Sequence, residues 1–273
     1  METARIVVSL PFRAEGPAEE HVGCRKTFDS RDMDRFLTAL YREIHEASAD
    51  CDDLLVREIV FGNGSAAHFT ADDLMRMVSE IKKQFHVSPQ AVIRFTVTPA
   101  GFDFYKLSAI RQMRGSVCFE LPALTDEGLQ AGEYHCTAEQ AAAALECCFQ
   151  NGFRQFSVYL TARSMKEKEA EETLKRLLAM HPEAIRLRKD AADPFTDTVN
   201  RILEAEGWTR RDHCWTCEAI PDPAPCSVQI GCGPNAVSVF ENTALRSTAD
   251  FEYYCEHADD FEALVRQAEQ DSI

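Results

Sequence analysis

The chain has 273 residues, of which 45% are hydrophobic and 9% aromatic, so it is long enough to bury a large core. Its 45 acidic residues outnumber the 29 basic ones, and the formal net charge of -16 excludes nucleic acid as a partner because such a field repels phosphate backbones. No run of about 18 apolar residues and no signal-peptide pattern occurs, so we expect a cytoplasmic protein that does not bind membranes. The odd number of cysteines, 11, indicates free thiols rather than a disulfide framework.

Strand-like and helix-like segments alternate along residues 1–206. Residues 4–10 form a β-branched and apolar run that ends at Pro11, which is typical of a buried strand. Similar patterns predict, in chain order, helix 32–48, strand 54–61, a helix opened by Thr70 and Asp73, strand 91–97, helix 106–113, strand 116–120, helix 137–150, strand 155–160, helix 165–180, strand 184–187 and helix 195–206. This alternation predicts an α/β fold, a partial (β/α)6-type TIM-like barrel.

The pattern changes in residues 207–273. Two short strand candidates, 214–220 and 227–232, precede a predicted terminal helix over residues 248–269. We expect this short C-terminal β/α segment to pack across one end of the barrel. No repeat, low-complexity stretch or linker interrupts the sequence, so residues 1–273 are predicted to form a single domain.

Four short motifs follow one another along the chain. They are Pro11-Phe12 after the first strand, Gly132-Glu-Tyr-His135, Gly231-Cys-Gly-Pro-Asn-Ala236 and Thr248-Ala-Asp-Phe-Glu-Tyr-Tyr254. In this order they resemble the radical SAM enzymes related to oxygen-independent coproporphyrinogen III oxidase and its heme-chaperone relatives. The corresponding family motifs are Pro-Phe, Gly-Arg-x-His, Gly-Leu-Gly-Pro-Gly-Ala and Asn-Thr-x-Asp-Leu-x-x-Tyr.

The chain departs from this family where the family binds its cofactors. The resemblance implies a [4Fe–4S] cluster on Cys-x3-Cys-x2-Cys directly after Pro-Phe, but these positions are Arg13, Pro17 and Glu20. Cys24 alone cannot replace three thiolates. Other strand-end positions are changed as well: Gly62-Asn-Gly-Ser-Ala66 stands for Gly-Gly-Gly-Thr-Pro, and an acidic residue, Gln and Asp are replaced by Thr96, Leu121 and Tyr159. We therefore predict that the cluster and the S-adenosylmethionine site have been lost.

Tetrapyrrole binding could survive this loss, because the resemblance implies a barrel mouth that admits a porphyrin with several carboxylates. Arg13 and Arg163 lie near predicted strand ends, where guanidiniums can pair with propionates. Asn63 and His135 complete the predicted ligand-binding mouth, with His135 as a candidate axial ligand. Arg94 is left out, because its mid-strand position directs the side chain into one layer of the sheet.

Four cysteines form an alternative site. Cys214 and Cys217 make a Cys-x2-Cys pair, and Cys226 and Cys232 follow, a set of soft ligands that would suit zinc. The spacing matches no zinc ribbon or knuckle, and Cys226 and Cys232 bracket a predicted strand. This favours buried cysteines that act as small hydrophobic residues.

Two functions of different class follow. The first is a pseudoenzyme, with no catalytic residue, that binds a tetrapyrrole or another carboxylated small molecule, or regulates a heme-related partner. No cofactor is expected, with heme, porphyrin or zinc as open alternatives. The second is an active oxygen-independent coproporphyrinogen III oxidase-like oxidoreductase, with a metal centre on the four cysteines or a cluster supplied by a protein partner.

Overall fold

The computed structural model describes residues 2–12, 30–49, 51–161, 166–187, 194–211, 214–217, 226–241 and 243–271. The strands form one sheet. In the order of the sheet they are β11 (Thr243–Arg246), β10 (Val237–Phe240), β9 (Val228–Cys232), β1 (Glu2–Ser9), β2 (Leu54–Gly62), β3 (Val87–Val97), β4 (Gly115–Leu121), β5 (Phe156–Leu160), β6 (Ala184–Leu187), β8 (Cys214–Thr216) and β7 (Thr209–Arg211).

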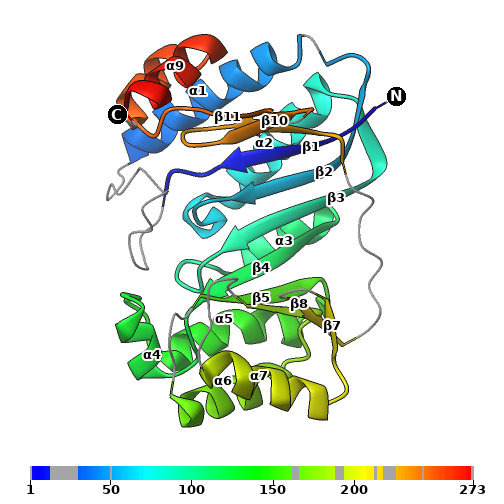
Figure 1. The fold of residues 1–273 in the computed structure, drawn as a ribbon, viewed down its shortest axis with the longest axis vertical. Coiled ribbons are helices and arrows are strands. Elements are labelled where there is room, and N and C mark those ends of the chain that lie inside the picture. Colours follow the sequence, from blue (N-terminus) through cyan, green and yellow to red (C-terminus); the bar gives the residue numbers. More distant parts are fainter. Residues whose placement is uncertain are drawn as a thin grey trace.

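The strands from β9 to β6 are parallel, as the alternation of elements predicts. Each of the outer strands β10, β11, β8 and β7 pairs antiparallel with its neighbours in the sheet. Among the described residues, β11 and β7 are the two edges and do not pair, so the sheet curves without closing (Figure 1). The predicted partial barrel is confirmed.

The helices of the βα units cover one face of the curved sheet. The helical segments are α1 (Ser30–Ala47), the 3-10 turn η1 (Ala66–His68), α2 (Ala71–Gln84), α3 (Phe104–Gln112), α4 (Asp126–Ala131), α5 (Ala138–Gln150), α6 (Glu167–Ala179), α7 (Pro194–Ala205), α8 (Phe251–His257) and α9 (Phe261–Asp271). None of the described helices combines the length and the apolar character that crossing a membrane requires.

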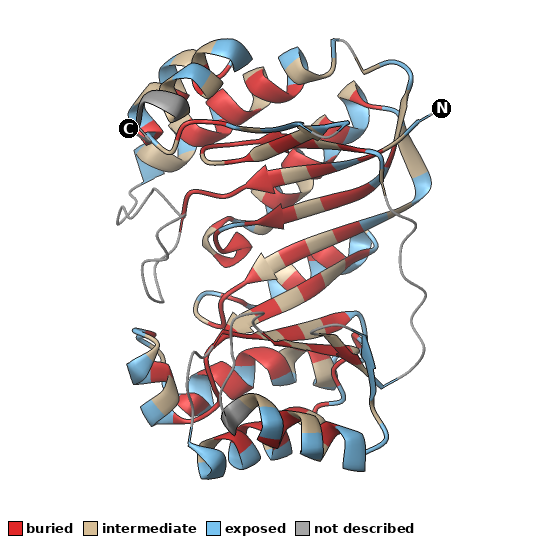
Figure 2. Cartoon of the chain, viewed as in Figure 1, coloured by how far each residue is buried: buried red, intermediate tan, exposed pale blue. Residues whose placement is uncertain are grey.

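Side chains alternate between the two faces of each strand. On β1, Ala4, Ile6 and Val8 are fully buried in the core beneath the helices, whereas Arg5 is exposed. Figure 1 shows α2 and α3 behind the strands, and Figure 2 shows buried and half-buried residues alternating along the strands. We call the face opposite α2 and α3 the open face.

Capping residues set the start of two helices. The predicted start at Thr70 is confirmed, because Thr70 Oγ1 accepts from Asp73 N at 3.1 Å and Asp73 Oδ2 accepts from Thr70 N at 3.1 Å. Thr137 and Gln140 form the same capping box at the start of α5.

The C-terminal segment does not pack across one end of the barrel, which corrects the expectation from sequence. It extends the sheet on both sides, with β9 beside β1 and β8 beside β6, because these strands would otherwise leave backbone donors and acceptors unpaired. The predicted terminal helix is also divided. Asp260 Oδ1 accepts from Ala263 N at 2.9 Å and starts α9 as a separate helix.

Candidate functional site

The carboxyl ends of β9, β1, β2 and β3 meet at one edge of the sheet, the place where parallel sheets build ligand sites. Leu10 N donates to Gly62 O at 2.8 Å, and Ser65 N donates to Phe12 O at 2.9 Å. A Cβ at Gly64 would clash with the carbonyl oxygens of Leu10 and Phe12. The Gly-rich turn after β2 therefore lies directly on the backbone that follows β1.

Asn63 takes part in side-chain hydrogen bonds that connect the ends of β2, β1 and β9 along this edge. Ser9 Oγ accepts from Asn63 Nδ2 at 3.2 Å and donates to the carbonyl oxygen of Pro234 at 2.6 Å. Asn63 has a φ of 61°, a left-handed conformation that asparagine tolerates. Because Ser9 engages one of the two N–H groups of the Asn63 amide, the carbonyl oxygen and the second N–H of Asn63 could contact a ligand.

Beneath the same edge lies a buried carboxyl, Glu43 of α1. Its Oε2 accepts from Gly233 N at 2.6 Å and from the hydroxyl of Tyr254 at 2.7 Å, while Oε1 has no hydrogen-bond partner within the described part of the chain. Burial raises the pKa of Glu43 to about 7, although both hydrogen bonds lower it. The carboxyl thus joins α1, α8 and the turn after β9.

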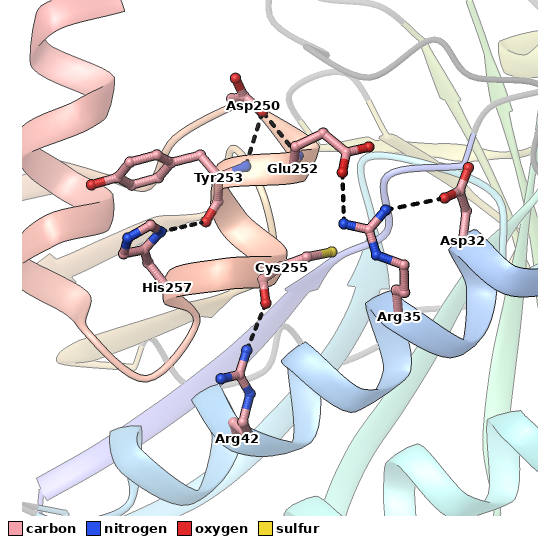
Figure 3. Close-up of polar contacts among 8 residues, drawn as sticks. All are labelled: Asp32, Arg35, Arg42, Asp250, Glu252, Tyr253, Cys255 and His257. Atoms are coloured by element: carbon pink, nitrogen blue, oxygen red, sulfur yellow. Dashed lines mark hydrogen bonds and ion pairs between the residues drawn. The ribbon is translucent and has the colours of Figure 1, made fainter.

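Two arginines of α1 contact α8 at the surface through an ion pair and a hydrogen bond (Figure 3). Arg35 Nη2 lies 2.6 Å from Glu252 Oε2, and Arg42 Nη2 donates to the carbonyl oxygen of Cys255 at 2.6 Å. Asp250 caps α8 by accepting from Glu252 N and Tyr253 N. These contacts are structural and fix the C-terminal segment on the first helix.

The open face carries charged side chains in the middle of the sheet. Arg94 of β3 lies 3.2 Å from Glu58 of β2, with the two side chains 26% and 9% exposed. Burial raises the pKa of the Cys118 thiol on β4, a hydrogen bond with Ser157 opposes this rise, and Arg186 of β6 opposes it as well. Strand pairing places Arg186 beside Tyr159. This group of residues was missing from the site predicted from sequence.

The structure places only part of the predicted site. Asn63 lies at the carboxyl end of β2, and His135 is exposed in the connection between α4 and α5. Arg13 and Arg163 lie outside the described residues.

The strand positions at which this sequence differs from the family motifs, Thr96, Leu121 and Tyr159, do not all lie on the same face of the sheet. Thr96 and Tyr159 are half-buried on the open face, but Leu121 is fully buried with the core. Its neighbour Glu120 is the residue that β4 presents to the open face. Strand alternation separates Glu120, Arg94 and Arg186 from the buried residues beside them, but it does not say that this face is the one that the helices leave open.

The four candidate zinc ligands are not brought together. Cys214 lies on β8 and Cys232 on β9, with β1 to β6 between them in the sheet. Neighbouring strands are about 4.8 Å apart, whereas a zinc ligand lies about 2.3 Å from its ion. Cys217 donates instead to the carbonyl oxygen of Pro182 at 3.7 Å, and Cys232 is buried in the core.

Comparisons with known proteins bear on the fold. No protein-family model matches the chain, and no curated protein sequence matches it. Coproporphyrinogen III oxidase (HemN) from Escherichia coli, described as a radical SAM enzyme, covers 97% of this chain and 70% of its own at a TM-score of 0.77 and 15% identity.

Two further solved structures are less similar. The protein anSMEcpe with bound AdoMet covers 67% of this chain and 50% of its own, at a TM-score of 0.49 and 9% identity. The radical S-adenosylmethionine methyltransferase TsrM from Kitasatospora setae covers 75% and 39%, at a TM-score of 0.39 and 13% identity.

The prediction of no cofactor, with heme, porphyrin or zinc as alternatives, is corrected by the match to coproporphyrinogen III oxidase. The protein that shares the fold is a radical SAM enzyme, so the groups that the fold implies are a [4Fe–4S] cluster and S-adenosylmethionine. The residues present do not fit a three-cysteine cluster. The described part of the chain contains no group of three His, Cys, Asp or Glu side chains that could hold a metal ion, and the sequence from 13 to 29 contains a single cysteine, Cys24.

The resemblance inferred from the four motifs is confirmed at the level of the fold. At 15% identity the match shows a shared fold and does not show a shared activity. This chain has the α/β partial-barrel fold of the radical SAM enzyme coproporphyrinogen III oxidase.

Proposed function

We propose that this chain is a coproporphyrinogen III oxidase-like protein that has lost the three-cysteine cluster site after β1 and binds a carboxylated small molecule without transforming it. The observation that carries the proposal is a retained fold with a changed loop: Arg13, Pro17 and Glu20 stand where the resemblance implies cluster cysteines. Arginine cannot replace a thiolate on iron, but it binds carboxylates well.

The ligand is expected to enter at the carboxyl edge of the sheet. Arg13 and Arg163 follow β1 and β5 in the sequence and would pair with carboxylates, and His135 would contact the ligand from the rim. The hydrogen bond between Asn63 and Ser9 keeps this edge rigid before binding, which lowers the entropic cost of complex formation. A tetrapyrrole with propionate groups is the first ligand to test, and a role beside heme synthesis in the cytoplasm follows from it.

The experiment combines two measurements on protein purified and reconstituted without oxygen. Iron and acid-labile sulfide are quantified first, and coproporphyrin III is then titrated while its Soret band is recorded. We expect less than one iron per chain and a saturable Soret shift that His135→Ala or Arg163→Gln weakens. Arg201→Gln, on the exposed face of α7, serves as the control and should leave the shift unchanged.

Other results would overturn the proposal. About four irons and four sulfides per chain, the content of one [4Fe–4S] cluster, would favour the alternative of an active oxidoreductase. A Soret shift that is insensitive to both substitutions would remove the predicted site. Absence of any shift would remove tetrapyrroles as the ligand class.

A further inference from the structure

Arg94 of β3 and Arg186 of β6 both lie on the open face, with β4 and β5 between their strands. Burial raises the pKa of the Cys118 thiol and of the Glu183 carboxyl, and the positive charges of Arg94 and Arg186 oppose the rise at both groups. Strands three positions apart in a sheet are separated by about 14 Å. Cys118 on β4 lies between the strands of the two arginines, so the charges of both act on the central part of the open face.

The two arginines differ in how their charges are balanced. Arg94 forms an ion pair with Glu58, whose side chain is only 9% exposed. Arg186 forms no ion pair with any carboxylate among the described residues, and its Nε is buried without a hydrogen-bond partner there. The buried Nε of Arg186 is costly to the folded state, because its N–H has lost water without gaining a partner among the described residues. Such a cost is typical of a group kept for a ligand.

From this placement we infer that Arg186 binds an oxyanion of the small-molecule ligand, a carboxylate, on the open face, with Arg94 as a second guanidinium beside it. The inference deepens the proposed function and rests on it for the ligand class. A planar guanidinium can hold a carboxylate through two parallel hydrogen bonds, and the hydroxyl of Ser157, one strand away, adds a further polar group.

The neighbouring charges decide which of the two arginines binds the anion more strongly. Glu58 neutralises much of the charge of Arg94, so Arg186 is the primary anchor and Arg94 a weaker one. Removal of the Glu58 charge should therefore strengthen anion binding, whereas removal of the Arg186 charge should weaken it. Arg201→Gln changes the net charge by the same amount as Arg186→Gln, so a loss of affinity confined to Arg186→Gln separates a specific site from a general effect of net charge.

The test uses citrate as the carboxylate probe, inorganic phosphate as the other oxyanion and propane-1,2,3-tricarboxamide as an uncharged control, all in a buffer of low chloride. Isothermal titration calorimetry is performed on the full chain and on Arg186→Gln, Glu58→Gln and Arg201→Gln. We expect Arg186→Gln to lose about tenfold or more in citrate affinity, the effect of one charge-assisted hydrogen-bond pair. Glu58→Gln should gain affinity, and Arg201→Gln should equal the parent chain.

A folding measurement makes the test independent of a damaged variant. Because Arg186 forms no ion pair within the described part of the chain, Arg186→Met should melt at the same temperature as the parent or above it. Citrate affinity that is unchanged in Arg186→Gln, or equal binding of the tricarboxamide, would overturn the inference. Phosphate bound more tightly than citrate would overturn the assignment of a carboxylate.

The inference and the proposed function can fail separately. Citrate binding that depends on Arg186, without any binding of coproporphyrin III, would support the anion site and remove the tetrapyrrole. Porphyrin binding that Arg186→Gln leaves unchanged would support the proposed function and overturn the inference.

Discussion

The buried carboxyl of Glu43, beneath the carboxyl edge of the sheet, makes the free energy of unfolding depend on pH. Its pKa is about 7 in the folded protein, against an ordinary value of 4.5. Between pH 4.5 and 7 the unfolded chain loses this proton while the folded protein keeps it, so the free energy of unfolding falls as pH rises. The loss is about 1.4 kcal/mol for each pH unit, on the order of 3 kcal/mol in total.

Urea unfolding of the parent chain and of Glu43→Gln at pH 5, 6, 7 and 8 measures this contribution. The difference between the two free energies should change by about 3 kcal/mol up to pH 7 and then level off. Glutamine keeps an oxygen that can accept from Gly233 and Tyr254, so other titrating groups cancel in the difference. Parallel curves over this range would show that Glu43 does not hold its proton in the folded state.

Two glycines of one turn offer a matched pair of substitutions. A methyl group at Gly64 would meet the carbonyl oxygens of Leu10 and Phe12, whereas one at Gly62 would meet side-chain atoms at ordinary contact distances of 3.6 and 3.8 Å. We expect Gly64→Ala to lower the free energy of unfolding by about 3 kcal/mol and Gly62→Ala to change it by less than about 1 kcal/mol. Equal effects of the two substitutions in urea unfolding would contradict the close approach after β1.

At the scale of elements, the attachment of α8 to α1 can be tested by hydrogen exchange. Arg42→Ala removes the donor to the Cys255 carbonyl oxygen and should cost about 1 kcal/mol. Amide exchange should accelerate in α8 but stay unchanged in α5. Arg201→Ala removes only exposed ion pairs on α6 and should cost less than about 0.5 kcal/mol. Unchanged exchange in α8 would mean that Glu43 and the core alone hold it.

Elements with long periodic patterns could be predicted from sequence, and short ones could not. The parallel strands and the helices α1, α2, α5, α6 and α7 follow from apolar periodicity and from caps such as Thr70. Helix α4 has six residues, and β10 and β11 have four each, which is too short for a period to be recognised. The division between α8 and α9 depends on the single capping residue Asp260.

Site residues whose partners are distant in sequence were missed for a similar reason. Glu43 lies on an amphipathic helix and reads as a surface residue, because its partners Gly233 and Tyr254 are 190 and 211 positions away. Arg186 was missed because sequence alternation gives two faces for a strand but not which face the helices leave open. Asn63 and His135 could be named only through the family motifs.

The whole molecule is expected to unfold as one unit, since one sheet contains strands from both ends of the described chain. Urea unfolding followed by tryptophan fluorescence reports on Trp208 before β7 and on Trp215 in β8, both near one edge of the sheet, and circular dichroism at 222 nm reports on helices throughout. The two transitions should coincide, as a single domain over residues 1–273 requires. An earlier fluorescence transition would define the β6–β8 edge as a separate unit.

The position of β1 between β2 and β9 has a consequence for synthesis of the chain. β1 can pair with β2 once Gly62 has been synthesised. Its other edge can pair with β9 only after Cys232 has been synthesised, which is 170 residues later (232 against 62). At ordinary translation rates this takes about 10 to 30 s. During that time the nascent chain presents the apolar strand Ala4–Val8 with an unpaired edge, a template for pairing with other chains. Expression yield should therefore depend on how fast ribosomes translate residues 63–232, and slow codons placed there should lower it more than the same codons placed after residue 232.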